Sequence, residues 1–179
     1  RTYPPQKEIC CGDQTLIELG RGALNGRVDT CLLDGGGRKI TDAVTPMGHT
    51  GQATSKDCVK PERTGSTPAQ PVVVANSEIS YCLDRGAKVQ DDFLLLSHNW
   101  IHNNLRCAMF AIVPQGTIAV DGNLIEENGM NCPRGAPPDC SDQVVTRPDA
   151  PQISAQGTGT AFMLDGNVVR HGPLSGVYW

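Results

Sequence analysis

Eight cysteines constrain this chain more than any other feature. Their number is even and they are spread along most of the 179 residues, which favours disulfides formed in an oxidising compartment. A zinc site and reduced, buried thiols are the alternatives, but no Cys-x-x-Cys pair supports zinc. We therefore expect a secreted protein with four disulfides, in which Cys132 and Cys140 form the best candidate for a local bridge. The full set is Cys10, Cys11, Cys31, Cys58, Cys82, Cys107, Cys132 and Cys140.

The hydrophobic core has few large side chains to draw on. Aromatic residues make up only 4% of the chain, so the core must consist of Val, Ile, Leu and Ala. The 20 glycines and 13 prolines favour many turns and oppose long helices. The composition predicts a mainly β fold (α+β) that disulfides stabilise.

One helix is predicted, over residues 13–25. Thr15 and Glu18 have the spacing of a capping box, and the apolar residues that follow form a broad face. Gly26 is suited to end the helix.

The remaining strands are predicted to form hairpins. Residues 28–33 and 38–45 flank a Gly-rich turn, and further strands are expected at 72–74 and 78–83. Two later segments, 118–125 and 162–169, share the pattern of an apolar run, Asp-Gly-Asn and an apolar pair. Asp-Gly between β-forming residues is a strong hairpin signal. We expect these hairpins to build one sheet or a β-sandwich.

Two small domains are a possible arrangement. The first is a cysteine-rich unit over 1–88, with the helix at 13–25 and a long loop at 46–71, and the second is a β-rich unit over 89–179. A boundary at 88 leaves an odd number of cysteines on each side. Either the fold is therefore one integrated unit, or the first unit extends past Cys107.

The 46–71 loop is the candidate binding element. Prolines and glycines interrupt any regular period there, and a bridge at Cys58 would limit its conformational freedom. Its mixed charges suit the polar rim of an interface. A surface insertion without a partner is the alternative. The charged residues are Lys56, Lys60, Glu62 and Arg63.

Catalytic chemistry has little support in the sequence. His98 and His102 would share a face of a helix and could bind a metal, but no Glu lies between them as in zinc proteases. Ser97 precedes His98, yet no Gly-x-Ser-x-Gly elbow is present. We expect no catalytic, metal or cofactor site, and we keep a small secreted hydrolase or cell-wall-active enzyme with a site near the two histidines as the alternative.

Other candidate residues have plain interpretations. Glu126 and Glu127 are expected to be a solvated pair, and few aromatic residues, Trp100 and Trp179 among them, could serve as sugar platforms. A net charge of −4 opposes nucleic-acid binding. No apolar run reaches the roughly 18 residues of a membrane span. We expect a monomer.

The arrangement of cysteines, helix and β-rich end resembles the secreted cysteine-rich effectors of plant-pathogenic fungi, and within them the dual-domain effectors. The resemblance covers Cys10, Cys11, the helix at 13–25, and then Cys31, Cys58, Cys82 and Cys107 before the β-rich end. It implies a non-enzymatic virulence protein that binds a host protein and that a host immune receptor can recognise. A secreted protease inhibitor that presents the 46–71 or 132–140 loop is a further alternative.

Overall fold

The computed structural model describes residues 15–35, 57–82, 84–104, 107–112, 115–129, 152–157, 160–172 and 176–178. Cys10, Cys11, Cys132, Cys140 and Lys56 lie outside these residues, as do the strand expected at 38–45 and Trp179. The described part is mainly β, as predicted, and none of its residues is helical. It accordingly holds no helix that could span a membrane.

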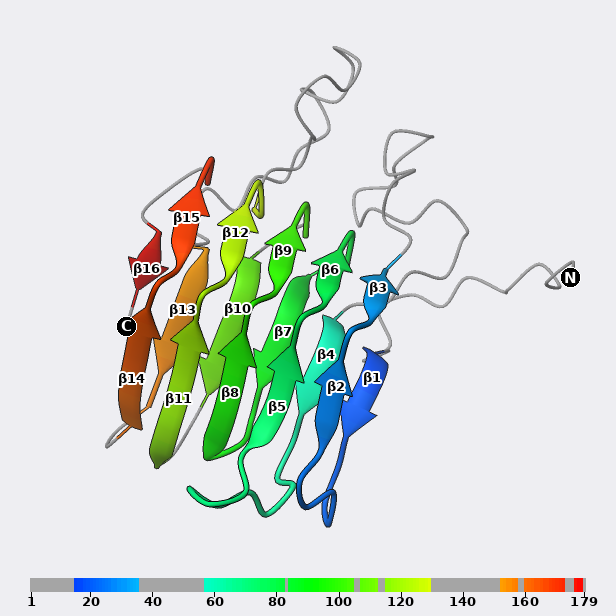
Figure 1. The fold of residues 1–179 in the computed structure, drawn as a ribbon, viewed down its shortest axis with the longest axis vertical. Coiled ribbons are helices and arrows are strands. Elements are labelled where there is room, and N and C mark those ends of the chain that lie inside the picture. The colour runs from blue at the N-terminus through cyan, green and yellow to red at the C-terminus, as the bar shows by residue number, and fades with distance from the viewer. Residues whose placement is uncertain are drawn as a thin grey trace, which may run out of the picture.

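Three parallel sheets form the described part, and the chain visits them in rotation (Figure 1). One passage through sheets A, B and C is a coil. Five coils, numbered in chain order from β1–β3 to β13–β15, stack so that equivalent strands pair within each sheet. This arrangement is a parallel β-helix. Sheet A contains β1 (Thr15–Leu19), β4 (Asp57–Pro61), β7 (Arg85–Val89), β10 (Cys107–Ile112), β13 (Ile153–Gln156) and β16 (Val177–Tyr178). Sheet B contains β2 (Arg27–Asp29), β5 (Val72–Ala75), β8 (Phe93–Ser97), β11 (Gly116–Asp121) and β14 (Thr160–Asp165). Sheet C contains β3 (Leu32–Asp34), β6 (Glu78–Ser80), β9 (Trp100–His102), β12 (Leu124–Glu126) and β15 (Val168–Arg170).

The corner between sheets B and C has the same backbone in every coil. One residue there has a positive φ, which bends the chain sharply and favours Gly or Asn. This residue is Gly122 in coil 4 and Gly166 in coil 5, each with a φ of 62°. The corresponding residues in coils 1 to 3 are Thr30, Asn76 and His98.

A ladder of polar side chains follows directly after these corner residues. The backbone N–H of Asn99 donates to Oδ1 of Asn123 (2.9 Å), and the N–H of Asn123 donates to Oδ1 of Asn167 (3.0 Å). Ser77 continues the ladder, since its N–H donates to Oδ1 of Asn99 and its hydroxyl accepts from the N–H of Cys31. The ladder satisfies buried backbone groups at a turn that has no sheet pairing of its own.

A second ladder occupies the corner between sheets C and A. Asn104 Nδ2 donates to Oδ1 of Asn128 (2.8 Å), whose own Nδ2 donates to Oε1 of Gln152 (2.8 Å). In coil 2 this ladder ends at the Cys58–Cys82 disulfide, and the N–H of Cys82 donates to Oδ1 of Asn104 (3.0 Å). The disulfide therefore closes one coil at the position where later coils carry amides.

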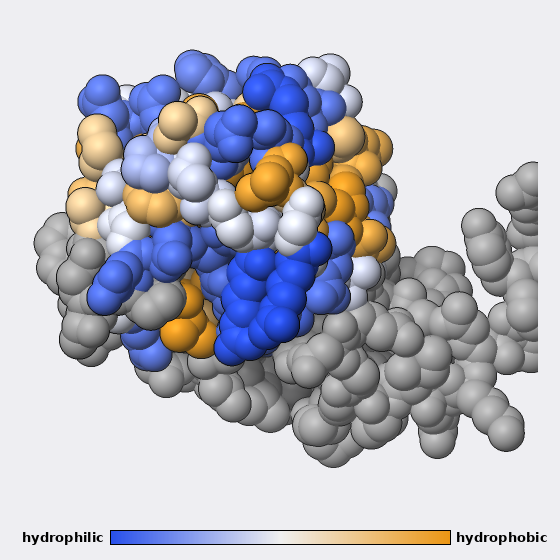
Figure 2. All heavy atoms as spheres, turned by 90° about the horizontal axis from the view of Figure 1, so that it is seen from below, coloured by the Kyte–Doolittle hydropathy of each residue, from blue (hydrophilic) through white to orange (hydrophobic). Residues whose placement is uncertain are grey.

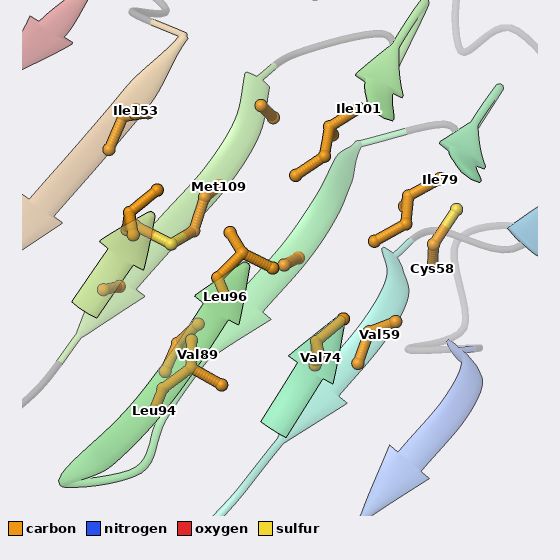
Figure 3. Close-up of a cluster of buried hydrophobic side chains, with 14 of the residues drawn as sticks. Cys58, Val59, Val74, Ile79, Val89, Leu94, Leu96, Ile101, Met109 and Ile153 are labelled. Atoms are coloured by element: carbon orange, nitrogen blue, oxygen red, sulfur yellow. The ribbon is translucent and has the colours of Figure 1, made fainter. Parts of the chain in front are cut away.

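The core fills the space between the three sheets with aliphatic side chains. Val74 and Leu96 of sheet B and Ile79 and Ile101 of sheet C point into it, together with Met109 of sheet A (Figure 3). All five residues are completely buried, with an exposed fraction of 0%. Successive coils place like residues above one another, so a core of this composition needs few aromatic rings.

The helix predicted over 13–25 is wrong. Thr15–Leu19 is β1, which pairs in parallel with β4, and the chain then turns. Exposure alternates along β1, as the period of a strand requires. Gly20 and Gly22 already weaken a helix there, and pairing with β4 outweighs the remaining helical preference.

The prediction that the Asp-Gly-Asn motifs form hairpins is also wrong, and so is the prediction of a β-sandwich. Both motifs are corner turns between sheets B and C, and the strands on either side belong to different sheets. The two copies lie one above the other, with Asp121 opposite Asp165 in parallel strands. The similarity marks equivalent positions of neighbouring coils.

The proposed domain boundary at residue 88 falls within a strand of sheet A. Residue 88 lies inside β7, whose neighbours β4 and β10 pair with it from either side. The three sheets continue across this position.

The 46–71 segment is not one continuous loop. Residues 46–56 lie outside the described part, and 57–61 form β4, in which Cys58 is fully buried. Within the described part of this segment, residues 62–71 form the loop. Its base is fixed by the buried carboxylate of Asp91, which accepts from the N–H of Thr64 (2.6 Å) and from the hydroxyl of Ser66.

The cysteines are only partly paired as expected. The Cys58–Cys82 bridge confirms a disulfide. Cys31 carries a free thiol, which donates to the carbonyl of Asp29 (3.2 Å), so the pairing expected of it is not seen. Cys107 is buried in β10.

Candidate functional site: the outer face of sheet C

Sheet C presents its outer face as two parallel rows of side chains. Because the middle residue of each short strand points into the core, the residues on either side of it lie on the outer side of the sheet, where Ser80 and His102 are nevertheless buried. The first row is largely apolar and contains Leu32, Glu78, Trp100, Leu124 and Val168. The second row is polar and contains Asp34, Ser80, His102, Glu126 and Arg170.

Trp100 stands at the centre of this face and is held in a fixed orientation. It is 42% exposed, although its indole N–H donates to Oε1 of Glu126 (2.9 Å) on the next coil. Its ring stacks on that of His102 at a centroid distance of 4.0 Å. A large aromatic surface therefore faces solvent without the rotational freedom of an unrestrained side chain.

His102 forms the buried side of this stack, and each of its ring nitrogens lies next to an oxygen atom. Nε2 lies 3.2 Å from Oε1 of Glu78, and Nδ1 lies 2.6 Å from Oδ1 of Asn103. The amide nitrogen of Asn103 donates to Glu127, which leaves its oxygen facing the imidazole. The ring of Tyr81 makes an edge-on contact with the imidazole ring of His102.

Glu126 joins three coils through its carboxylate. Oε2 accepts from Nε of Arg170 (2.7 Å), while Oε1 accepts from Trp100. The hydrogen bond from Arg170 is the main cause that lowers the pKa of Glu126 below its ordinary value. The carboxylate is therefore charged at neutral pH and unsuited to act as a general acid.

We call the group Glu78, Trp100, His102, Glu126 and Arg170 the Trp100 surface. It combines an exposed aromatic ring with a guanidinium and two carboxylates, which are groups that bind through stacking and charge-assisted hydrogen bonds. In the described part of the chain no cluster of three or more His, Cys, Asp or Glu could hold a metal ion.

The two histidines do not form a joint site. His98 is the exposed corner residue of coil 3, and its ring lies over Gly122, where a Cβ would be 3.0 Å from Nε2. His102 belongs to β9, and both of its nitrogens are engaged. The helical spacing that suggested a shared face does not apply, because the segment is a corner followed by a strand.

Of the charged residues proposed as a binding loop, the three that the structure describes, Lys60, Glu62 and Arg63, lie near the end of β4 and in the turn beyond it. Lys60 is in β4 and forms ion pairs with Glu62 (2.5 Å) and Glu18 (3.9 Å). The hydrogen bond from Lys60 is the main cause that lowers the pKa of Glu62. Arg63 has a positive φ of 49°. Lys60 lies between two acidic residues, so its charge is compensated.

Sequence reasoning singled out Trp100, His102 and Glu126 separately but missed Glu78 and Arg170. Parallel pairing places Trp100 opposite Leu124 and His102 opposite Glu126, and both pairs have the same spacing in the sequence. A recurring spacing of this kind was a usable signal, because repeats indicate stacked coils in which equivalent residues meet.

Comparisons with protein-family models, with curated proteins and with solved structures find no match to this chain.

Proposed function

We propose that the protein is a secreted, non-enzymatic, effector-like virulence protein that binds a host protein through the Trp100 surface. The observation that carries this proposal is the fixed and exposed ring of Trp100. Interface hot spots are rich in Trp, Tyr and Arg, and a side chain already ordered before binding loses little entropy. Recognition by a host immune receptor would use the same exposed face.

The charges of the face indicate the chemistry of the partner. Glu78 and Glu127 border the stack, while Arg170 is already bonded to Glu126. The side-chain charge that remains on this face is therefore negative. A partner that fits this face presents an apolar side chain to Trp100, with Lys or Arg residues around it.

The disulfide supports secretion as part of the proposal. Structural disulfides persist in oxidising compartments. Cys58–Cys82 is buried in the corner of coil 2 and is protected there from reductants in solution.

Binding measured with matched variants tests this function. Wild type, Trp100→Ala, Trp100→Phe and the control Leu24→Ala are offered to extracellular plant proteins, and retained proteins are identified by mass spectrometry. Leu24 is 56% exposed in the turn after β1, away from sheet C. A partner should bind wild type and Leu24→Ala equally, and Trp100→Ala at least about tenfold more weakly by calorimetry with purified protein. Trp100→Phe should fall between them. A partner that binds Trp100→Ala as well as wild type contradicts the proposal.

A secreted protease inhibitor is the second candidate, because of the 62–71 loop. Thr64 and Ser66 fix its base to Asp91, whereas the tip at 67–70 is exposed. A rigid base below an exposed tip is the arrangement that lets a loop bind with little ordering cost. Replacing 67–70 by Gly-Ser-Gly-Ser should abolish inhibition in a panel of secreted proteases. Absence of inhibition by the wild type removes this candidate.

A further inference from the structure

The two ends of the β-helix differ in how their inner layers are covered. In coil 1, the inward residues Val28 and Leu33 are 4% and 7% exposed. In coil 5, the inward residue Leu164 is 38% exposed, although its partner Val120 one coil earlier is 0% exposed. The apolar layer is therefore open at coil 5, at sheet B.

The backbone at this end is also unpaired on one side. Within the described residues β14 pairs with β11 alone, while sheet A continues one strand further to β16. The carbonyl of Asp165 accepts from Gly122 of the previous coil. Since successive residues of a parallel strand direct their N–H and C=O groups to opposite neighbours, those of Phe162 and Leu164 point to the free edge.

The edge lacks the features by which proteins prevent strand pairing. Thr160–Asp165 contains neither Lys nor Pro, and Met163 on its outer side is 59% exposed. Asp165 already lies opposite Asp121. A further strand would therefore be favoured by a basic residue at this position, since a third acid would add repulsion.

We propose that the free edge of β14 is a second docking site, which receives an extended segment of a partner protein as an added strand. The segment places two apolar side chains over Phe162 and Leu164 and a Lys or Arg beside Asp165. Main-chain hydrogen bonds supply affinity, and the alternate side chains supply specificity. This site is independent of the Trp100 surface.

A peptide copied from the chain itself is a suitable probe. Residues 115–129 already pair with β14 and β15 in register from the opposite side, so their alternation matches this edge. The probe carries Asp121→Lys, and the control peptide carries Ile118→Ser and Val120→Ser in addition. Binding to the full chain is measured by fluorescence anisotropy, and amide hydrogen exchange is followed at Phe162 and Leu164.

Two protein variants on the same strand sharpen the test. Leu164→Lys places a charge in the open inner layer, whereas Met163→Lys places the same charge on the outer face. The probe should bind saturably and protect both amides, and Leu164→Lys should weaken binding by about tenfold or more while Met163→Lys changes it by less than about twofold. If Leu164→Lys does not fold, amide protection in the wild type decides.

Three outcomes overturn the proposal. They are no saturation up to about 1 mM probe, equal binding of the control peptide, and equal weakening by the two variants. Sedimentation equilibrium is run in parallel, because concentration-dependent dimers that Leu164→Lys abolishes would assign the edge to a second copy of this chain instead.

Discussion

The side-chain amide of Asn99 donates to the side-chain oxygen of Asn123 over 3.0 Å, one coil further along the β-helix. The same oxygen accepts from the backbone N–H of Asn99, and the amide of Asn123 donates to the carbonyl of Leu96. One buried side chain thus satisfies three polar groups of the previous coil.

Asn123→Ala should therefore lower the free energy of unfolding by about 3 kcal/mol, because it leaves several buried polar groups unsatisfied. Asn123 is 1% exposed, so water cannot replace the lost bonds without rearrangement. Urea unfolding followed by circular dichroism measures the change. Asn167→Ala is the matched control and should cost less, since Asn167 belongs to the last coil and is only partly buried. Equal losses would show that the ladder does not act as a connected element.

Removal of the Cys58–Cys82 disulfide should destabilise the protein by about 3 kcal/mol, because the bridge closes a loop with a sequence separation of 24. The double variant Cys58→Ala/Cys82→Ala is compared with wild type by urea unfolding without reductant. Cys31→Ser is the control and should change stability little, because Cys31 carries a free thiol. A large loss for Cys31→Ser would mean that this cysteine is paired in solution.

The environment of Trp100 should change as Glu126 takes up a proton. The pKa of Glu126 is lowered from its ordinary value of 4.5, mainly by the hydrogen bond from Arg170. Its contribution to stability is therefore present above pH 4.5 and is lost as the pH falls through the lowered pKa. In a Trp179→Phe background, Trp100 emission should shift only below pH 4.5. Arg170→Ala should move this transition to higher pH, and an unchanged transition would contradict the assigned cause.

Asp57 should show the opposite dependence on pH. Burial is the main cause that raises its pKa above the ordinary 3.8, and the nearby Arg85 opposes this change. The folded state therefore holds the proton more tightly, so stability falls as the pH rises from 3.8 through the raised pKa. Asp57→Asn removes this loss, while Arg85 keeps its ion pair with Asp84 (2.7 Å). The stability of the variant relative to wild type should increase over this range in thermal unfolding.

Asp29→Asn is the matched control for that measurement. The pKa of Asp29 is lowered, mainly by the hydrogen bond from Asn76. Its stabilising effect is present above 3.8 and is lost as the pH falls, so this variant should lose stability relative to wild type as the pH rises. The same sign for both variants would show that the two environments are not as described.

The local turn chemistry could be predicted from the sequence, but the strand pairing could not. Asp121-Gly122-Asn123 and Asp165-Gly166-Asn167 specify a bend, because Gly adopts a positive φ and Asn bonds to nearby backbone. A bend of this kind serves a hairpin or the corner of a coil equally well. Which of them forms depends on whether a strand gains more from its neighbour in sequence or from the strand one coil away, and that is a non-local energy.

The mainly β fold and a disulfide followed from composition, since many glycines and prolines oppose helices and a core with few aromatic residues needs cross-links. Tertiary structure alone decided that Thr15–Leu19 is a strand, because β4 supplies its pairing. It also decided the candidate site. Glu78, His102 and Glu126 lie on three separate coils, and they meet because parallel pairing places Glu126 opposite His102 and Glu78 opposite Trp100, within hydrogen-bond distance of His102.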